Sequence, residues 1–260
     1  ADRLMKVWDV ATGNEINLPK GHLAEVTALA LNSNNLASGS NDKNTKVWDN
    51  ISGNEISSFG DMEVSFITFS QDGKYVATGT WDVIRIWEKF TGKMIRELRE
   101  HSNVVRWLKF TKDGKFLYSA SLDGNILKWS CETGNVISKI ETNSSIECAV
   151  LLEEKDQIFC GNWSGTVLGY DLLKGEQIIS FEAHGLTITN IDFIQNGKYL
   201  ITGSEDGNIK LWEPGTWKLS FTQKVGTVKR FAIVPDKDIV IMLIPENLVE
   251  IWSLSNFEKK

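Results

Sequence analysis

Residues 26–59 read VTALALNSNNLASGSNDKNTKVWDNISGNEISSF, and the pattern of this stretch decides the fold. Apolar residues alternate with others in VTALAL at Val26–Leu31, which is the two-residue period of a β-strand. NLASGS follows, the turn DKN reverses the chain, and TKVWD forms a third strand that contains Trp48. NEISSF supplies a fourth strand after the turn at Ser52 and Gly53. The stretch therefore predicts four short antiparallel strands.

The third-strand phrase returns at regular intervals along the chain. In each copy an apolar stretch ends in an aromatic residue, usually followed by an acid, and neighbouring copies lie 39 to 42 residues apart. The seven aromatic residues are Trp8, Trp48, Trp87, Trp129, Tyr170, Trp212 and Trp252. A repeated unit of this size buries its apolar face against its own copies, and four strands per period form the blade of a β-propeller. No segment has apolar residues at helical spacing over several turns, so we expect almost no helix.

The number of strands predicts an all-β, seven-bladed β-propeller of four-stranded antiparallel blades, with incomplete first and last blades. The chain opens on a third and a fourth strand, continues through five full sets, and ends with three strands of a seventh set, which gives 25 strands. Seven complete blades need 28 strands. The period then implies about 35 to 40 further residues upstream, as in a fragment of a longer protein. A six-bladed closure with 24 strands is the alternative.

Composition adds limits to this architecture. No linker interrupts the period, so residues 1–260 are predicted to form one domain. The net charge of −6, without a run of Lys and Arg, argues against a nucleic-acid partner. No apolar run approaches the roughly 18 residues that span a bilayer, so we expect no membrane insertion. The start of the chain lacks the basic and apolar leader of a signal peptide.

The three cysteines predict an intracellular chain without a metal site. Cys131, Cys148 and Cys160 are odd in number and lack the paired spacing of zinc ligands. We interpret them as reduced thiols, with Cys148 and Cys160 as small packing residues in strands. No cofactor is expected, and the predicted location is the cytoplasm, with the nucleus not excluded.

Three repeats carry a second pattern around the motif aromatic. A His precedes the first strand, a Ser or Thr lies in the second, an Asp lies in the next turn, and the Trp follows that Asp by six residues. The sets are His22, Ser38, Asp42 and Trp48; His101, Ser119, Asp123 and Trp129; and His184, Thr202, Asp206 and Trp212. This pattern resembles the WD-repeat family over essentially the whole chain. The resemblance implies a buried polar network in which each of the four groups has a partner.

His, Ser and Asp also occur together in hydrolytic enzymes. Against a catalytic interpretation, the set occurs three times and each copy ends on a Trp that has no role in acyl transfer. The other repeats depart from the pattern: the third keeps Thr78, Asp82 and Trp87 without a His, the fifth has Ser164 and Tyr170, and the seventh keeps only Trp252, with Pro245 where the turn should be. We therefore predict structural networks, and we expect the incomplete blades to hold their turns by other contacts and to open first.

The resemblance implies a non-catalytic scaffold that binds partner proteins or peptides on the face with the Asp turns and the channel mouth, without a small-molecule substrate. A search for an enzyme site finds only the acids Glu153, Glu154 and Asp156, which are interpreted as a solvated turn, and no glycine-rich phosphate loop. One alternative is a sensor propeller appended to a signalling ATPase or another multidomain enzyme. Another is a ubiquitin-ligase substrate receptor, which is disfavoured because the adaptor-docking Arg positions hold other residues.

Family positions on that face nominate the partner-binding residues. They are Trp81, Trp163, Leu122, Arg106, Glu147, Glu25, Glu63 and Lys229. Trp81 and Trp163 precede the turn position in repeats without a complete network, so they are either partner contacts or covers for those repeats. An apolar arc of Trp81, Leu122 and Trp163 predicts docking over repeats three to five. The excess of acids over bases favours a peptide with some positive charge.

Overall fold

The computed structural model describes residues 6–8, 12, 14–16, 21–60, 62–195, 197–234, 239–244, 248–254 and 258–259. The chain divides into two compact units, residues 1–143 and residues 144–260, and each is considered by itself below. Both units consist of antiparallel β-sheets. Within the described residues the helical content is one 3-10 turn, η1 (Glu153–Lys155), so the expectation of almost no helix is confirmed.

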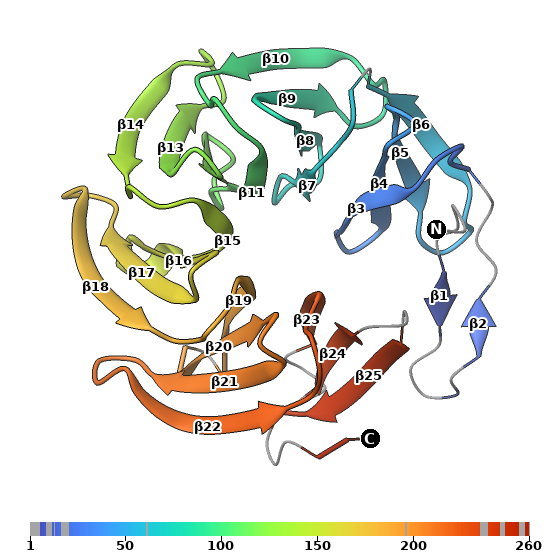
Figure 1. The fold of residues 1–260 in the computed structure, drawn as a ribbon. Helices are drawn as coiled ribbons and strands as arrows, with labels where there is room; N and C mark the ends of the chain where they lie inside the picture. Colours follow the sequence, from blue (N-terminus) through green and yellow to red (C-terminus); the bar gives the residue numbers. More distant parts are fainter. Residues whose placement is uncertain are drawn as a thin grey trace. The chain divides into compact units, whose positions relative to one another are not determined.

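The first unit contains three four-stranded blades and a two-stranded sheet (Figure 1). In each blade, strands that follow one another in sequence pair with each other. The two-stranded sheet joins β1 (Val7–Trp8) to β2 (Glu15–Ile16). The blades are β3 (Val26–Leu31), β4 (Asn35–Ser40), β5 (Thr45–Asp49) and β6 (Glu55–Phe59); β7 (Phe66–Phe69), β8 (Tyr75–Gly79), β9 (Val83–Glu88) and β10 (Met94–Arg99); and β11 (Val105–Phe110), β12 (Phe116–Ser121), β13 (Asn125–Ser130) and β14 (Val136–Glu141).

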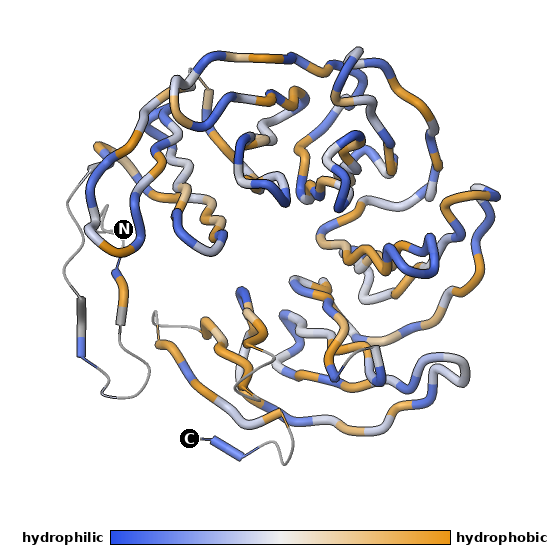
Figure 2. Tube along the Cα trace, turned by 180° about the vertical axis from the view of Figure 1, so that it is seen from behind, coloured by the Kyte–Doolittle hydropathy of each residue, from blue (hydrophilic) through white to orange (hydrophobic). Residues whose placement is uncertain are grey.

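The second unit contains two four-stranded blades and a final blade of three strands. Its strands are β15 (Ile146–Leu152), β16 (Gln157–Asn162), β17 (Thr166–Asp171) and β18 (Glu176–Glu182); β19 (Ile188–Ile194), β20 (Tyr199–Ser204), β21 (Asn208–Glu213) and β22 (Lys218–Lys224); and β23 (Arg230–Val234), β24 (Ile239–Ile244) and β25 (Leu248–Ser253). Hydrophobic residues lie within these strands and hydrophilic residues occupy many of the turns, as in the first unit (Figure 2).

The prediction of seven blades is wrong, because the described strands form six blades, five with four strands and the last with three. The motif count exceeds the blade count because the first motif copy, at Trp8, lies on β1. Among the described residues this strand pairs with β2 in a sheet of two strands, each two residues long. Six blades is the number in the alternative considered above, although the described strands number 25 and not 24.

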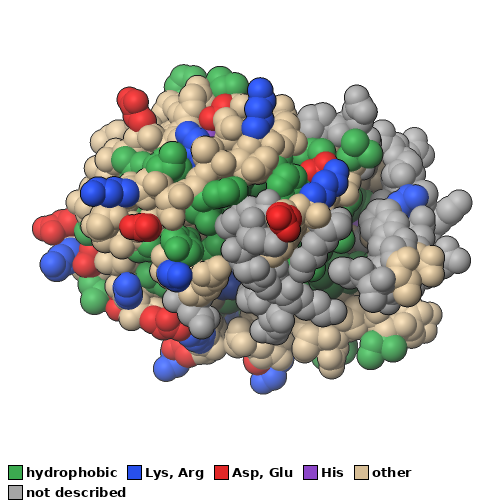
Figure 3. Space-filling model, turned by 90° about the horizontal axis from the view of Figure 1, so that it is seen from below, with side chains coloured by type: hydrophobic (Ala, Val, Ile, Leu, Met, Phe, Trp, Pro, Cys, Tyr) green, Lys and Arg blue, Asp and Glu red, His purple; other side chains and the backbone are tan. Residues whose placement is uncertain are grey.

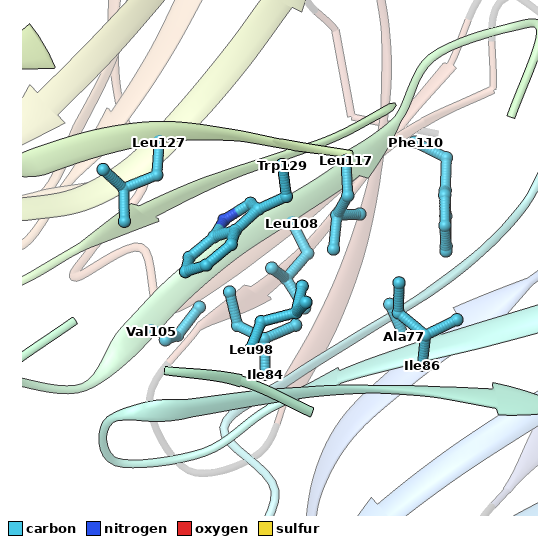
Figure 4. Close-up of a cluster of buried hydrophobic side chains, with 10 residues drawn as sticks. All are labelled: Ala77, Ile84, Ile86, Leu98, Val105, Leu108, Phe110, Leu117, Leu127 and Trp129. Carbon is cyan, nitrogen blue, oxygen red and sulfur yellow. The ribbon is translucent and has the colours of Figure 1, made fainter. Parts of the chain in front are cut away.

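The hydrophobic cores lie between successive blades. In the first unit, Ile84 and Leu98 of one blade pack against Leu108, Leu117 and Trp129 of the next, and all five are at most 2% exposed (Figure 4). In the second unit, residues of blade β15–β18 share one cluster with residues of blade β19–β22. Full burial of a Leu or Ile side chain contributes about 1.5–3 kcal/mol. Since these contacts cross from blade to blade, each blade depends on its neighbour for its core.

Hydroxyl groups form a second link between blades. Thr27 Oγ1 donates to the carbonyl of Val64 at 2.5 Å, Ser65 Oγ to that of Val105 at 2.7 Å, and Thr189 Oγ1 to that of Val228 at 2.7 Å. The register of the first strand shifts at Thr27 and at Thr189, as in a β-bulge. A bulge re-aims one side chain out of the regular alternation, which here directs the hydroxyl to the next blade.

Candidate functional site

Blade β11–β14 shows the four-residue polar network in full. His101 Nδ1 lies 2.8 Å from Asp123 Oδ2, and its Nε2 lies 2.8 Å from Ser119 Oγ. Because a carboxylate only accepts, we assign the ring proton to Nδ1, so that Nε2 accepts from the Ser119 hydroxyl. The Ser119 oxygen in turn accepts the Trp129 Nε1–H at 2.8 Å. Each of the four side chains of this network therefore has a hydrogen-bond partner within it.

The same arrangement occurs in two further blades, one in each unit. In blade β3–β6 the distances along His22, Ser38, Asp42 and Trp48 are 2.9 Å for His–Asp, 2.7 Å for His–Ser and 2.9 Å for Trp–Ser. In blade β19–β22 the distances along His184, Thr202, Asp206 and Trp212 are 2.9, 2.8 and 2.9 Å in the same order. The structure therefore brings together all twelve residues nominated for the networks.

The Asp of each network also ties two loops together. Asp123 accepts the amides of Ser102, before the first strand, and of Asn125, after the turn, at 2.9 and 2.8 Å. Burial alone would raise the pKa of the Asp123 carboxyl, but hydrogen bonds from His101 and the Ser102 amide lower it by more, so its pKa lies well below 3.8. Burial likewise acts to raise the pKa values of Asp42 and Asp206, but both pKa values are lowered: that of Asp42 by hydrogen bonds from the Leu23 amide and His22, and that of Asp206 by its electrostatic interaction and hydrogen bond with His184.

The histidine of blade β19–β22 is held in its neutral form. Burial lowers the pKa of His184 below 6.5, and this effect outweighs the charge and hydrogen bond of Asp206, which act in the opposite direction. A neutral imidazole has one N–H donor and one acceptor nitrogen. This is the state that the network needs, with the acceptor nitrogen facing Thr202.

The geometry of the networks does not suit acyl transfer. A nucleophilic hydroxyl must reach substrate, yet Ser38, Ser119 and Thr202 are fully buried, with 0% exposure. Each of these oxygens also accepts an indole N–H, a contact that occupies the lone pair a nucleophile would use. The arrangement instead joins three segments of one blade, and we propose that its role is structural.

Blades with incomplete networks use other contacts at the same place. In blade β7–β10, Trp87 still donates to Thr78 Oγ1 at 2.9 Å, and Thr80 bonds both backbone groups of Val83 across the turn. In blade β15–β18, Asn162 Oδ1 accepts the amide of Thr166 at 2.8 Å. Its Nδ2 donates to Ser144 at 2.8 Å.

Sequence reasoning missed Asn162. A signal was present in the spacing. Ser121 stands two residues before Asp123, and its hydroxyl accepts the Asp123 amide at 3.1 Å. Asn162 stands at the same distance before Ser164, which occupies the Asp position. In the same blade the hydroxyl of Tyr170 points to Gln177, at 3.1 Å. In the last blade Trp252 donates to Glu250 at 2.9 Å, and Pro245 lies outside the described residues.

The two nominated tryptophans are both solvent-exposed. Trp81 lies in the turn between β8 and β9 in the first unit, Trp163 lies in the turn between β16 and β17 in the second, and each is 64% exposed. Leu122 is half-buried beside the start of its first strand, since its amide donates to the carbonyl of Val104 at 3.0 Å. The arc of Trp81, Leu122 and Trp163 takes residues from both units, so it stays a prediction.

The charged residues nominated for binding lie at the start of first strands. Arg106 and Glu147 are half-buried at the register shifts of β11 and β15. Glu25, Glu63 and Lys229 are exposed. On the face drawn in Figure 3, acidic and basic side chains are interspersed and do not form a field of one sign.

The cysteines behave as packing residues. Burial raises the pKa of Cys131 and of Cys148 to about 12, and it raises the pKa of Cys160 well above 9.0. Cys148 Sγ lies 3.3 Å from the carbonyl of Ile188 in the next blade. Among the described residues, no group of three or more His, Cys, Asp or Glu side chains could hold a metal ion. The described ranges also contain no helix with the length and apolar character needed to cross a membrane.

Comparison with known proteins places the chain in a family. A family model described as the first β-propeller of IFT122 matches residues 1–253. The chain belongs to this family. Its curated relatives are WD-repeat proteins, so the resemblance seen in the motif residues is confirmed.

The relatives of this IFT122 propeller-family chain include proteins with several different names. Serine-threonine kinase receptor-associated protein of Gallus gallus is 26% identical over 228 residues, which cover 84% of this chain and 65% of that protein. Autophagy-related protein 16 of Arabidopsis thaliana is 23% identical over 252 residues, or 93% and 49% of the two chains. Pre-mRNA-processing factor 17 of Homo sapiens is 27% identical over 135 residues, or 50% and 23%. The chain thus spans less than two thirds of the length of these relatives.

Proposed function

We propose that this propeller is a non-catalytic platform that holds partner proteins or peptides on the face that carries the Asp turns. Its family and its relatives are of the WD-repeat scaffold type. The name of the Gallus gallus relative itself describes association with another protein. An intracellular location belongs to the same proposal and is supported by the buried, protonated thiols. The proposed partners include neither nucleic acids nor small-molecule substrates.

The exposure of Trp81 and Trp163 supports this proposal most directly. An indole that covers a gap in its own blade has to be buried there, yet both side chains are 64% exposed. Such apolar area in water contributes nothing to folding, whereas binding hot spots are enriched in Trp. Each indole also lies at the turn of a blade that lacks the His-centred network. These two turns are thus free to present side chains chosen for contact with a partner.

Charge around the indoles favours partners with some positive charge. Glu63 is exposed at the start of the blade that carries Trp81, and Glu147 starts the blade that carries Trp163. Interfaces match charge mainly to gain specificity and rate of association. We therefore propose that a preferred peptide places an apolar or aromatic residue on an indole and a Lys or Arg near one of these glutamates.

Single substitutions test the proposal in each unit separately. Trp81→Ala and Trp163→Ala should each weaken partner capture by about 2 kcal/mol if the indoles are hot spots. The thermal midpoint should stay within a few degrees of the parent value, because each side chain lies mostly in solvent. Quantitative pull-down against a fixed series of bait concentrations measures the first quantity, and thermal unfolding measures the second.

Matched controls are available at the other turns of the blades. Ile51 is 89% exposed between β5 and β6, and Leu173 is 78% exposed between β17 and β18. Their replacement by Ala removes comparable exposed apolar area and should leave capture unchanged. Retention of all partners by the Trp81→Ala/Trp163→Ala double variant, or its loss of folded structure, would return both indoles to a packing role.

The length comparison supports one further part of the proposal. The family is described as a first propeller, and the chain covers 65% or less of the relatives named above. We propose that the platform is one domain of a longer protein. This proposal shares with the sensor-domain alternative only the presence of further domains. No observation favours a signalling ATPase or a ubiquitin ligase in particular.

A further inference from the structure

One turn of the second unit departs from its counterparts. The turn between the third and fourth strands is closed in five blades by the same hydrogen bond, from an amide to the carbonyl four residues earlier. In four of them the donor is a glycine with positive φ: Gly53 at 73°, Gly92 at 67°, Gly134 at 83° and Gly175 at 72°. In blade β19–β22 the donor is Trp217, with φ of 52°.

A tryptophan is a costly choice for this position. Positive φ is uncommon outside glycine and is an outlier for a bulky residue, so the surroundings of Trp217 must hold it there. The ring packs against Phe159 and Phe181 of the preceding blade, with centroids 5.2 and 5.9 Å away. Residues with strained backbone concentrate at functional sites, so we looked for a function at Trp217 besides packing.

A pocket of about 330 Å³ lies beside the indole, between the two blades. Its apolar lining includes Leu152, Phe159, Ile178, Phe193 and Trp217. This pocket is built from the turns that follow β15, β19 and β21, at the opposite ends of the strands from the turn that carries Trp163.

We propose that this Trp217 pocket binds one uncharged apolar side chain, aromatic or branched aliphatic, from a partner polypeptide. The volume is at the small end of the range for ligand pockets, which suits a single side chain with part of its backbone. Among the charged lining residues Glu154 and Lys155 are of opposite sign, so the lining favours neither an anion nor a cation. A charged group against the apolar part of the lining would lose hydration that these side chains do not replace. Gln157 and this charged pair can instead bond the peptide groups on either side of the inserted residue.

The site goes beyond the proposed function and is independent of it, since neither Trp81 nor Trp163 contributes to its lining. If the Trp81 and Trp163 predictions failed, the pocket proposal would still stand. If the pocket bound no probe, the proposal for Trp81 and Trp163 would still stand.

Fluorine NMR on the full chain tests the pocket directly. With 5-fluorotryptophan incorporated, the Trp217 resonance is assigned by its loss in Trp217→Phe. The probes are N-acetyl-phenylalanine amide and N-acetyl-leucine amide, with N-acetyl-glycine amide as the blank. The two apolar probes should shift the Trp217 resonance to saturation, while the blank should not shift it and the Trp163 resonance should stay in place.

Two substitutions on β18 and its preceding turn separate the pocket from general apolar contact. Ile178 is 44% exposed on the outer strand β18, so Ile178→Glu should fold and should weaken probe binding about tenfold or more by placing a charge on the wall. Leu173→Glu, in the exposed turn of the same blade, should leave binding unchanged. Equal binding by Ile178→Glu, a shift shared with Trp163, or no saturable shift up to the solubility of the probes would overturn the proposal.

Discussion

His101 joins parts of its blade that are distant in sequence, because its ring contacts Ser119 on β12 and Asp123 in the next turn. The replacement His101→Ala leaves a buried carboxylate and a buried hydroxyl without this partner. An unsatisfied buried polar group costs about 1–3 kcal/mol, so we expect the free energy of unfolding to fall by that amount. Urea unfolding followed by tryptophan fluorescence measures it.

The control for this substitution is Glu132→Ala on the same blade, whose side chain is exposed and whose loss should change stability little. If His101→Ala keeps the stability of the parent and removes a hydrolytic activity, the structural interpretation of the networks is wrong.

The depressed pKa of His184 predicts a dependence of stability on pH. Its folded-state pKa lies below the ordinary 6.5, so the unfolded chain takes up a proton that the folded chain resists. The contribution of His184 is therefore complete above about pH 6.5 and decreases as the pH falls below that value. The lowered pKa values of Asp42 and Asp206 act in the same direction below about pH 3.8.

Urea midpoints between pH 8 and pH 5 measure this dependence. The parent should lose stability on acidification through this window, and His184→Gln, which cannot titrate, should lose less. A parent protein that becomes more stable from pH 7 to pH 5 would contradict the predicted direction.

Individual residues also show how far sequence reasoning can go. The networks could be nominated because their four residues stand at nearly fixed spacing and the chemistry of each is evident from its type. Asn162 replaces that chemistry with a side-chain amide, and its role depends on contacts with Thr166 and Ser144 that spacing does not reveal. Trp217 could not be recognised because the sign of φ is not visible in a sequence.

At the scale of elements, blades with and without networks should differ in local stability. Blades β7–β10 and β15–β18 lack the His-to-Asp link, and the last blade has three strands. If the link is worth about 1–3 kcal/mol, amides of the hairpin β8–β9 should exchange with solvent roughly 5- to 150-fold faster than those of β12–β13.

Within the second unit the same comparison sets β16–β17 against β20–β21. Native-state hydrogen exchange resolved by peptide mass spectrometry provides the rates. Equal protection of the paired hairpins would mean that the substitute contacts of Thr80 and Asn162 fully replace the networks.

The strands themselves were largely predictable, because alternation and glycine-containing turns mark them. The stretch quoted first forms β3 to β6 nearly as read, with β3 at Val26–Leu31 and β5 at Thr45–Asp49. The register shifts at Thr27 and Glu147 were not predicted, since one residue added to a strand leaves the alternation on either side intact.

At the scale of the whole molecule, the periodicity identified the architecture but not the number of blades. A motif marks one strand, whereas a blade needs three or four that pair, and the copy at Trp8 lies in a two-stranded sheet. The pairing of a strand depends on long-range contacts that a local phrase does not encode. The prediction of a single domain and the arc across repeats three to five likewise concern relations between distant parts, and they stay predictions.

The hydroxyl links between blades have a practical consequence for anyone who shortens or recombines this chain. A cut after β10 would remove the carbonyl of Val105 that accepts from Ser65, and it would uncover the side of Ile84 and Leu98 that faces β11. A cut within unit two after β22 would likewise deprive Thr189 of the Val228 carbonyl. Each of these two cuts thus removes a hydrogen bond between blades and exposes an apolar surface at the same time, so the resulting fragments are expected to precipitate unless the newly exposed side is redesigned.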